Sequence, residues 1–62
     1  MKLKIKDKMR IIGITTEDLA KKIGVSKQAV YKWMSGFAFP THGNLVKLAE
    51  VLETKPSALI SD

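Results

Sequence analysis

The side chains best suited to specific chemistry in this 62-residue chain are a lysine, an amide and a phenol that lie close together. Lys27, Gln28 and Tyr31 are followed by Lys32, and a helix that begins after Ser26 would present all four to solvent. Lysine and glutamine can hydrogen-bond base edges in a DNA major groove, and a phenol can contact a thymine methyl group or a phosphate. The alternative is an ordinary solvated helix face, so the neighbouring elements must decide.

Residues 15–36 predict two short helices. Thr15 or Thr16 can cap the first, because a side-chain oxygen there can accept from the free N–H groups of the opening turn. Gly24 is expected to end this helix in the left-handed conformation, and Ser26 can cap the next one. These helix start and stop signals therefore predict a first helix, a tight corner and a second helix.

The predicted corner is only three residues long, from Gly24 to Ser26. Two helices joined so closely must cross steeply, and we expect Ala20, Val25 and Val30 to form the small core between them. This is the layout of a helix-turn-helix, here at about residues 16–35, whose second helix can enter a major groove.

Length and composition limit the other possibilities. Residues 1–62 permit a single domain with a small core. The chain has no cysteine, so neither a disulfide nor a thiolate metal site can stabilise it. One histidine and six scattered acidic residues form no recognisable catalytic set, so we expect no enzymatic activity, no cofactor and no metal site.

The net charge of +5 is unevenly distributed. Residues 1–10 carry five cationic side chains against Asp7 alone, and residues 21–32 contain four lysines and no acid. Phosphate contacts dominate affinity for nucleic acids, so these clusters favour a polyanionic partner. No stretch has the length of a membrane span or the apolar core of a signal peptide, and we therefore expect a cytoplasmic protein.

The first dozen residues are ambiguous. Their polar and apolar alternation is typical of a strand, whereas Ile5, Met9 and Ile12 form a helical stripe. We favour a helix that ends at Gly13, because the sequence offers no second strand-like run for pairing. Residues 1–4 can still be frayed or extended, and could add an edge strand in a dimer. A basic amphipathic segment can also lie on a membrane surface, an alternative that the domain's own core makes less favourable.

Two aromatic residues, Phe37 and Phe39, follow the second helix of the motif. We expect at least one of them to fill the small core, and the other to lie beside the DNA backbone or at a partner surface. The next predicted helix covers residues 41–52. Its apolar stripe consists of Leu45, Leu48, Ala49 and Leu52.

The polar start of that helix has two possible roles. Thr41 or Asn44 can simply cap it, or His42 and Asn44 can contact a phosphate, since free N–H groups at a helix start bind anions. A last short helix is expected to open at Pro56. Leu59 and Ile60 then either close the core or form an apolar end, which is our first candidate for a dimer contact.

Taken together, these residues resemble a known family, the Cro/cI-type helix-turn-helix repressors of phages and bacteria. The residues that carry the resemblance extend over about residues 5–60: Leu19-Ala20, Gly24-Val25-Ser26, Val30, Trp33, Gly36, Pro40, Leu45, Leu48-Ala49 and Leu52. The resemblance implies an all-α, five-helix lambda-repressor-like domain that binds DNA through its third helix and acts as a dimer. By position, it implies base contacts from Lys27, Gln28 and Tyr31. Phosphate contacts are implied for Thr16, Ser26, Lys32, His42 and Asn44.

Two positions depart from the family pattern. Members usually begin the second helix with glutamine, and this chain has Thr16, which keeps a phosphate hydrogen bond but not a long-reaching amide contact. Members also often pair an arginine in the first helix with a glutamate late in the third, where this chain has Met9 and Met34. Replacing both partners of a buried ion pair by apolar groups can be neutral or stabilising. We therefore predict that Met9 and Met34 touch.

The hypothesis that follows is a Cro-like phage or prophage repressor, whose two copies bind a two-fold double-stranded DNA operator. The alternative is a protein-interaction module of the same fold, such as an antitoxin or anti-repressor. Its working surface would consist of Phe37, Phe39, Leu59 and Ile60. Salt-sensitive, sequence-selective binding to duplex DNA favours the first hypothesis, and indifference to DNA with a tight protein partner favours the second.

Overall fold

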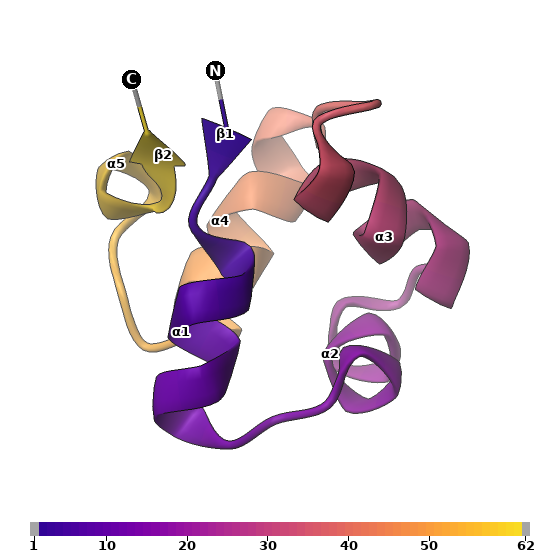
Figure 1. Ribbon diagram of the computed structural model, residues 1–62, viewed down its shortest axis with the longest axis horizontal. Coiled ribbons are helices and arrows are strands. Elements are labelled where there is room, and N and C mark those ends of the chain that lie inside the picture. Colours follow the sequence, from indigo (N-terminus) through magenta and orange to yellow (C-terminus); the bar gives the residue numbers. More distant parts are fainter. Residues whose placement is uncertain (1, 62) are drawn as a thin grey trace.

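The computed structural model describes residues 2–61, and shows five helices in one bundle (Figure 1). Met1 and Asp62, the ends of the predicted domain, lie outside the described residues. The elements in chain order are β1 (Lys2–Leu3), α1 (Ile5–Ile12), α2 (Thr16–Ile23), α3 (Lys27–Ser35), α4 (His42–Val51), α5 (Pro56–Leu59) and β2 (Ile60–Ser61). The expected five-helix, all-α fold is confirmed, with one short pairing of the chain ends added to it.

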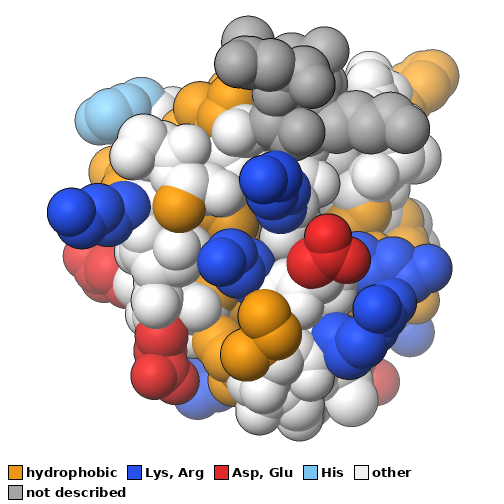
Figure 2. Space-filling model, turned by 60° about the vertical axis from the view of Figure 1, so that its left-hand side comes forward, with side chains coloured by type: hydrophobic (Ala, Val, Ile, Leu, Met, Phe, Trp, Pro, Cys, Tyr) orange, Lys and Arg blue, Asp and Glu red, His pale blue; other side chains and the backbone are white. Residues whose placement is uncertain are grey.

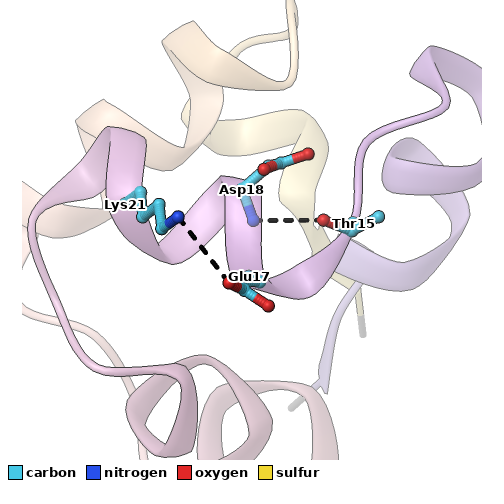
Figure 3. Close-up of polar contacts among 4 residues, drawn as sticks. All are labelled: Thr15, Glu17, Asp18 and Lys21. Carbon is cyan, nitrogen blue, oxygen red and sulfur yellow. Dashed lines mark hydrogen bonds and ion pairs between the residues drawn. The ribbon is translucent and has the colours of Figure 1, made fainter.

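Hydroxyl side chains begin three of the helices. Thr15 caps α2, because its Oγ1 accepts a hydrogen bond from the backbone N–H of Asp18 at 3.1 Å (Figure 3). Ser26 and Thr41 accept in the same way from the N–H group three residues ahead, at 3.2 and 3.3 Å, and so cap α3 and α4. Thr15 rather than Thr16 is thus the cap of α2, and Thr41 rather than Asn44 is the cap of α4.

The predicted corner between α2 and α3 is present. Gly24 has a φ of 90° and ends α2, and its N–H donates to the carbonyl of Ala20 at 2.8 Å. Glycine reaches this left-handed region without the steric cost of a Cβ atom. Ala20 and Val30 are buried and Val25 packs against the core, so the corner closes on the small apolar cluster that the sequence predicts.

The core draws on every helix. Its members are Leu3, Ile5, Met9, Leu19, Ala20, Ile23, Val30, Trp33, Leu45, Leu48, Ala49, Leu52 and Leu59. The predicted apolar stripe of α4 is confirmed, since all four of its residues are buried. Within residues 3–60, none of the buried side chains is polar or charged, so burial of apolar area holds the helices together.

Residues near the two ends of the chain pair with each other, an arrangement that was not predicted from the sequence. β1 and β2 form an antiparallel ladder in which Lys2 is opposite Ser61 and Leu3 is opposite Ile60. The N–H of Lys4 extends it by donating to the carbonyl of Leu59 at 2.7 Å. The expectation that residues near the N-terminus have no partner strand was wrong, because the partner, β2, has only two residues and shows no strand pattern of its own.

The structure does not support the prediction that Leu59 forms a dimer contact. Its side chain is completely buried in the core, so it cannot form part of a surface that a second copy would meet. Ile60 is partly buried and packs against the same core. Of the two alternatives for this apolar end, closing the core is therefore the one that the structure bears out for Leu59.

The predicted core role of the aromatic loop, residues 37–39, was also wrong. Phe37 and Phe39 are 82% and 51% exposed, so neither fills the core as we expected for at least one of them. The backbone N–H groups of Phe37 and Ala38 both donate to the carbonyl of Lys32, at 2.9 and 3.2 Å. These bonds fold the loop back against the end of α3 and turn the phenylalanines outward, and Pro40 is the buried residue of the loop.

Membrane-spanning and metal-binding features are both missing from residues 2–61. No helix in this part of the chain combines the length and the apolar character that crossing a membrane would require. The same residues contain no group of three or more histidine, cysteine, aspartate or glutamate side chains that could hold a metal ion.

Candidate nucleic-acid interface

The third helix has one buried side and one solvent-facing side. Val30 and Trp33 are buried, which fixes the rotation of α3 against the rest of the bundle. As a result, the four residues predicted for the outer side are exposed: Lys27, Gln28, Tyr31 and Lys32. Tyr31 is 50% exposed, so part of its side chain is accessible to a partner. A donor-rich surface is thus held on a rigid helix.

The charge on this surface is entirely positive. Residues 27–35 contain no acidic side chain. Within residues 2–61, the ion pair that forms joins Lys21 to Glu17 on α2 at 3.6 Å (Figure 3), and neither Lys27 nor Lys32 is paired. Two unpaired cations on one exposed helix favour an anionic partner.

The start of α3 reinforces this positive character. Helix N-termini carry partial positive charge, so acidic residues usually occupy the first turn. In α2 this turn contains Glu17 and Asp18, as expected, whereas in α3 it contains Lys27 and no acid. A cation at this position works against helix stability, and such a departure from the stability rules is expected at functional sites.

The surface around α1 is more mixed in charge. Figure 2 turns the left-hand side of Figure 1 forward and shows basic, acidic and hydrophobic side chains interspersed. In α1, Lys6, Lys8 and Arg10 alternate with Asp7 and with Ile11, which is 77% exposed. Unlike α3, this helix carries an acidic side chain among its cations.

The predicted phosphate contacts lie at helix starts. Thr16 is the first residue of α2 and is half-buried, and His42 is the exposed first residue of α4. Asn44 is half-buried, and its backbone N–H is occupied by the Thr41 cap. The first N–H groups of a helix have no intrahelical acceptor, so both starts retain donors for an anion. Contact of these residues with phosphate stays a prediction.

Ser26 combines a structural and a predicted binding role. Its Oγ accepts from the N–H of Ala29, which leaves the hydroxyl hydrogen available to donate. Ser26 is also exposed. A phosphate at the start of α3 could therefore accept from Ser26 without disturbing the cap.

Comparison with known proteins decides the family. The family model described as helix-turn-helix matches residues 5–59, which is most of the chain. The chain belongs to the Cro/cI-type helix-turn-helix family. As a member of this family of repressors, it is a sequence-specific DNA-binding protein.

Two solved structures resemble this helix-turn-helix domain closely. The DNA-binding domain of the P22 c2 repressor, determined by nuclear magnetic resonance, is 28% identical, with a TM-score of 0.81; the match covers 86% of this chain and 70% of that one. The crystal structure of the P22 c2 repressor in complex with synthetic operator 9T is 29% identical, with a TM-score of 0.84; it covers 94% of this chain and 89% of that one. A search of curated proteins gave no match.

The helix-turn-helix domain departs from its family between α1 and α3. Met9 is buried, and Met34 is partly buried and packs against the core, so neither side chain lies in open solvent. This burial agrees with an apolar replacement of the usual ion pair. Direct contact between the two methionine side chains stays a prediction.

A groove at the end of α3 was not predicted from the sequence of this helix-turn-helix domain. Lys6 of α1 and Phe37 of the following loop line it together with Tyr31, Lys32, Met34 and Ser35. Lys6 and Phe37 are far apart in the sequence, and no local pattern links them. The available signal was the aromatic residue that follows Gly36, and we had expected a core role for it or for Phe39.

Proposed function

We propose that this protein is a transcriptional repressor of phage or prophage type. It binds a two-fold operator as a dimer, with α3 of each copy in a major groove. The single observation that carries this proposal is the outer side of α3, where exposed cationic and amide side chains stand on a rigid helix with no carboxylate. We place the protein in the cytoplasm of a bacterial host, and assign it no enzymatic activity.

Three side chains read base edges in this proposal. Lys27 donates to O6 or N7 of guanine, and Gln28 makes a two-point contact with adenine. Tyr31 contacts a thymine methyl group or a phosphate. Because each good base contact distinguishes one base pair from the others, these residues determine the operator sequence.

The remaining contacts position the domain on the duplex. Lys32 and the residues at the helix starts bind phosphates: Thr16, Ser26, His42 and Asn44. Two copies bind half-sites about one helical turn apart, since a two-fold protein requires a two-fold site. Occupancy then excludes polymerase or a competing repressor from the same DNA. Burial of Leu59 leaves Ile60 as the candidate dimer residue at this end of the chain.

Selection of bound sequences from a random duplex pool tests the proposal. We expect an enriched palindrome, because a dimeric protein reports its symmetry in the preferred site. The Gln28→Ala variant should lose roughly 1–3 kcal/mol of binding free energy on that site and should accept any base at one position of each half-site. An unchanged preference in this variant would show that the reading residues are misassigned, and failure to enrich any sequence would overturn the proposal.

A second measurement separates positioning from reading. The Lys32→Ala variant should weaken binding to all duplexes alike, and should lower the slope of log affinity against log salt by about 1. Lys47→Ala is the matched control, because Lys47 is exposed on α4 and is not assigned to the interface. Equal salt slopes for the two variants would contradict a phosphate contact by Lys32.

A further inference from the structure

The groove at the end of α3 is shallow and open to solvent, with a volume of about 500 Å³. Such a shape suits a protein segment better than an enclosed small molecule. Its walls are mostly apolar, from Met34, Phe37 and the ring of Tyr31, and its two charged groups are Lys6 and Lys32. Phe37 is 82% exposed and Tyr31 is 50% exposed, so two neighbouring aromatic side chains of the groove remain open to solvent.

The position of the groove couples it to the DNA-binding surface. Its walls come from α1, from the last half of α3 and from the loop after α3. α3 also packs against β1, the strand that leads into α1 (Figure 1). Tyr31 and Lys32 belong both to the groove and to the outer side of α3. Any large molecule seated in the groove therefore covers part of the proposed operator contact.

Operator DNA is a poor match for this groove. Protein–DNA interfaces are more polar and more positively charged than protein–protein interfaces, which are enriched in aromatic residues and methionine at their centres. A sugar-phosphate backbone could pair with Lys6 and Lys32, but it would leave Met34 and Phe37 without an apolar partner. The apolar walls indicate a protein side chain instead.

A second copy of this chain is also a poor match. In a two-fold contact the same surface lies on both sides, so the Lys6 and Lys32 side chains of the two copies would face each other. Like charges in such a contact are costly. Charge complementarity requires an occupant that carries carboxylates.

We propose that this groove binds an acidic segment of a partner protein, which inserts a large apolar side chain between Met34 and Phe37. Carboxylates on either side of the inserted residue pair with Lys6 and Lys32. Because Tyr31 and Lys32 are shared, a bound partner releases the domain from DNA. Binding of the acidic segment does not require the proposed operator contacts to be correct. Release from DNA does rest on that proposed function.

Selection from a phage-displayed library of random linear peptides, with the intact protein immobilised, tests the site without assuming the sequence of the partner. The enriched peptides should combine several acidic residues with one or two large apolar ones. A synthetic peptide of the enriched sequence should then bind Phe37→Ser and Lys6→Glu at least about tenfold more weakly than the unaltered protein, as expected for loss of an anchor residue. Both positions are exposed, so these variants should keep the fold and its circular dichroism spectrum.

Ile11→Ser is the matched control. Ile11 is 77% exposed, close to Phe37 in accessibility, but lies outside the groove. Equal affinity of the peptide for Ile11→Ser and the unaltered protein supports the groove. A peptide that discriminates against Ile11→Ser but not Phe37→Ser overturns it, and so does a library that yields no acidic, apolar-containing sequence.

Competition with DNA gives a separate readout. The selected peptide should displace the duplex obtained by the random-pool selection, and should fail to do so with the Phe37→Ser variant. A peptide that binds the groove but leaves the duplex in place overturns the release mechanism. If no duplex is bound at all while the peptide still binds, the operator proposal fails and the groove stands.

Discussion

Lys27 stands at the position in α3 where a cation is least favourable to the helix. The first-turn N–H groups of α3 carry partial positive charge, and no acidic residue in that turn balances it. We predict that Lys27→Glu raises the free energy of unfolding by about 0.5 kcal/mol, because the new carboxylate interacts favourably with the helix start. The same substitution should abolish binding to the selected duplex, because a carboxylate would then face the DNA.

Urea unfolding and a duplex-binding titration on the same preparation measure the expected gain in stability and the expected loss of DNA binding. The control is Asp18→Lys in α2, which introduces a cation into a helix start outside the proposed reading residues and should lower stability. A Lys27→Glu protein that is less stable than the parent would contradict the electrostatic account. One that still binds DNA with full affinity would remove Lys27 from the interface.

A double-mutant cycle tests whether the side chains of Met9 and Met34 touch. Both side chains belong to the packed interior or its edge, one on α1 and the other on α3. If they touch, the Met9→Ala and Met34→Ala losses should not add, and the coupling free energy should be at least about 0.5 kcal/mol. Additive losses for Met9 and Met34 would show that the two methionines are separate.

At the scale of the element, the caps of α2 and α3 are chemically matched but differ in their proposed roles. Thr15 and Ser26 each accept one hydrogen bond, at 3.1 and 3.2 Å, from the third residue of the helix that follows. Substituting either by alanine should lower the free energy of unfolding by about 1 kcal/mol. Only Ser26→Ala should also weaken duplex binding at conditions where both variants remain folded, since only Ser26 is assigned a phosphate contact.

The measurement compares thermal unfolding with DNA affinity for the two variants. Equal DNA affinities in Thr15→Ala and Ser26→Ala would assign Ser26 to the cap alone. A larger stability loss in one helix than in the other would indicate that its cap also supports tertiary packing.

The elements of this fold are predictable where their causes are local. Gly24 ends α2 and Ser26 caps α3 through contacts with residues only a few positions away, so the corner could be derived from the sequence. The stripe on α4 is equally local. The pairing of β1 with β2 joins the two ends of the chain, and no pattern within either two-residue strand indicates the other.

The same distinction applies to the candidate interface. The outward direction of Gln28 follows from the helical period once Val30 and Trp33 are placed inside. The exposure of Phe37 depends on backbone bonds to Lys32 that wrap the loop around the end of α3, and hydrophobicity alone suggested burial. The groove requires α1, α3 and the loop to be assembled, so it could be found only in three dimensions.

At the scale of the whole molecule, a small core must hold five short helices without disulfides. Domains of this size usually have only about 3–5 kcal/mol of stability from a single core. Leu59 contributes a completely buried side chain from α5, the shortest helix, and its carbonyl accepts from Lys4 at the other end of the chain. Leu59 therefore contributes both to the core, through its side chain, and to the pairing of the chain ends, through its carbonyl.

We therefore predict that Leu59→Ala destabilises the domain by about 3 kcal/mol, through lost apolar burial and the cavity left behind. Much of the protein should then be unfolded at room temperature, as measured by urea titration with the fluorescence of buried Trp33. The loss should be the same at low and high protein concentration, because Leu59 packs within one copy. If Leu59 were instead a dimer contact, the variant's deficit would shrink as dilution dissociated the parent protein. Ile11→Ala is the exposed control and should change stability by less than about 0.5 kcal/mol.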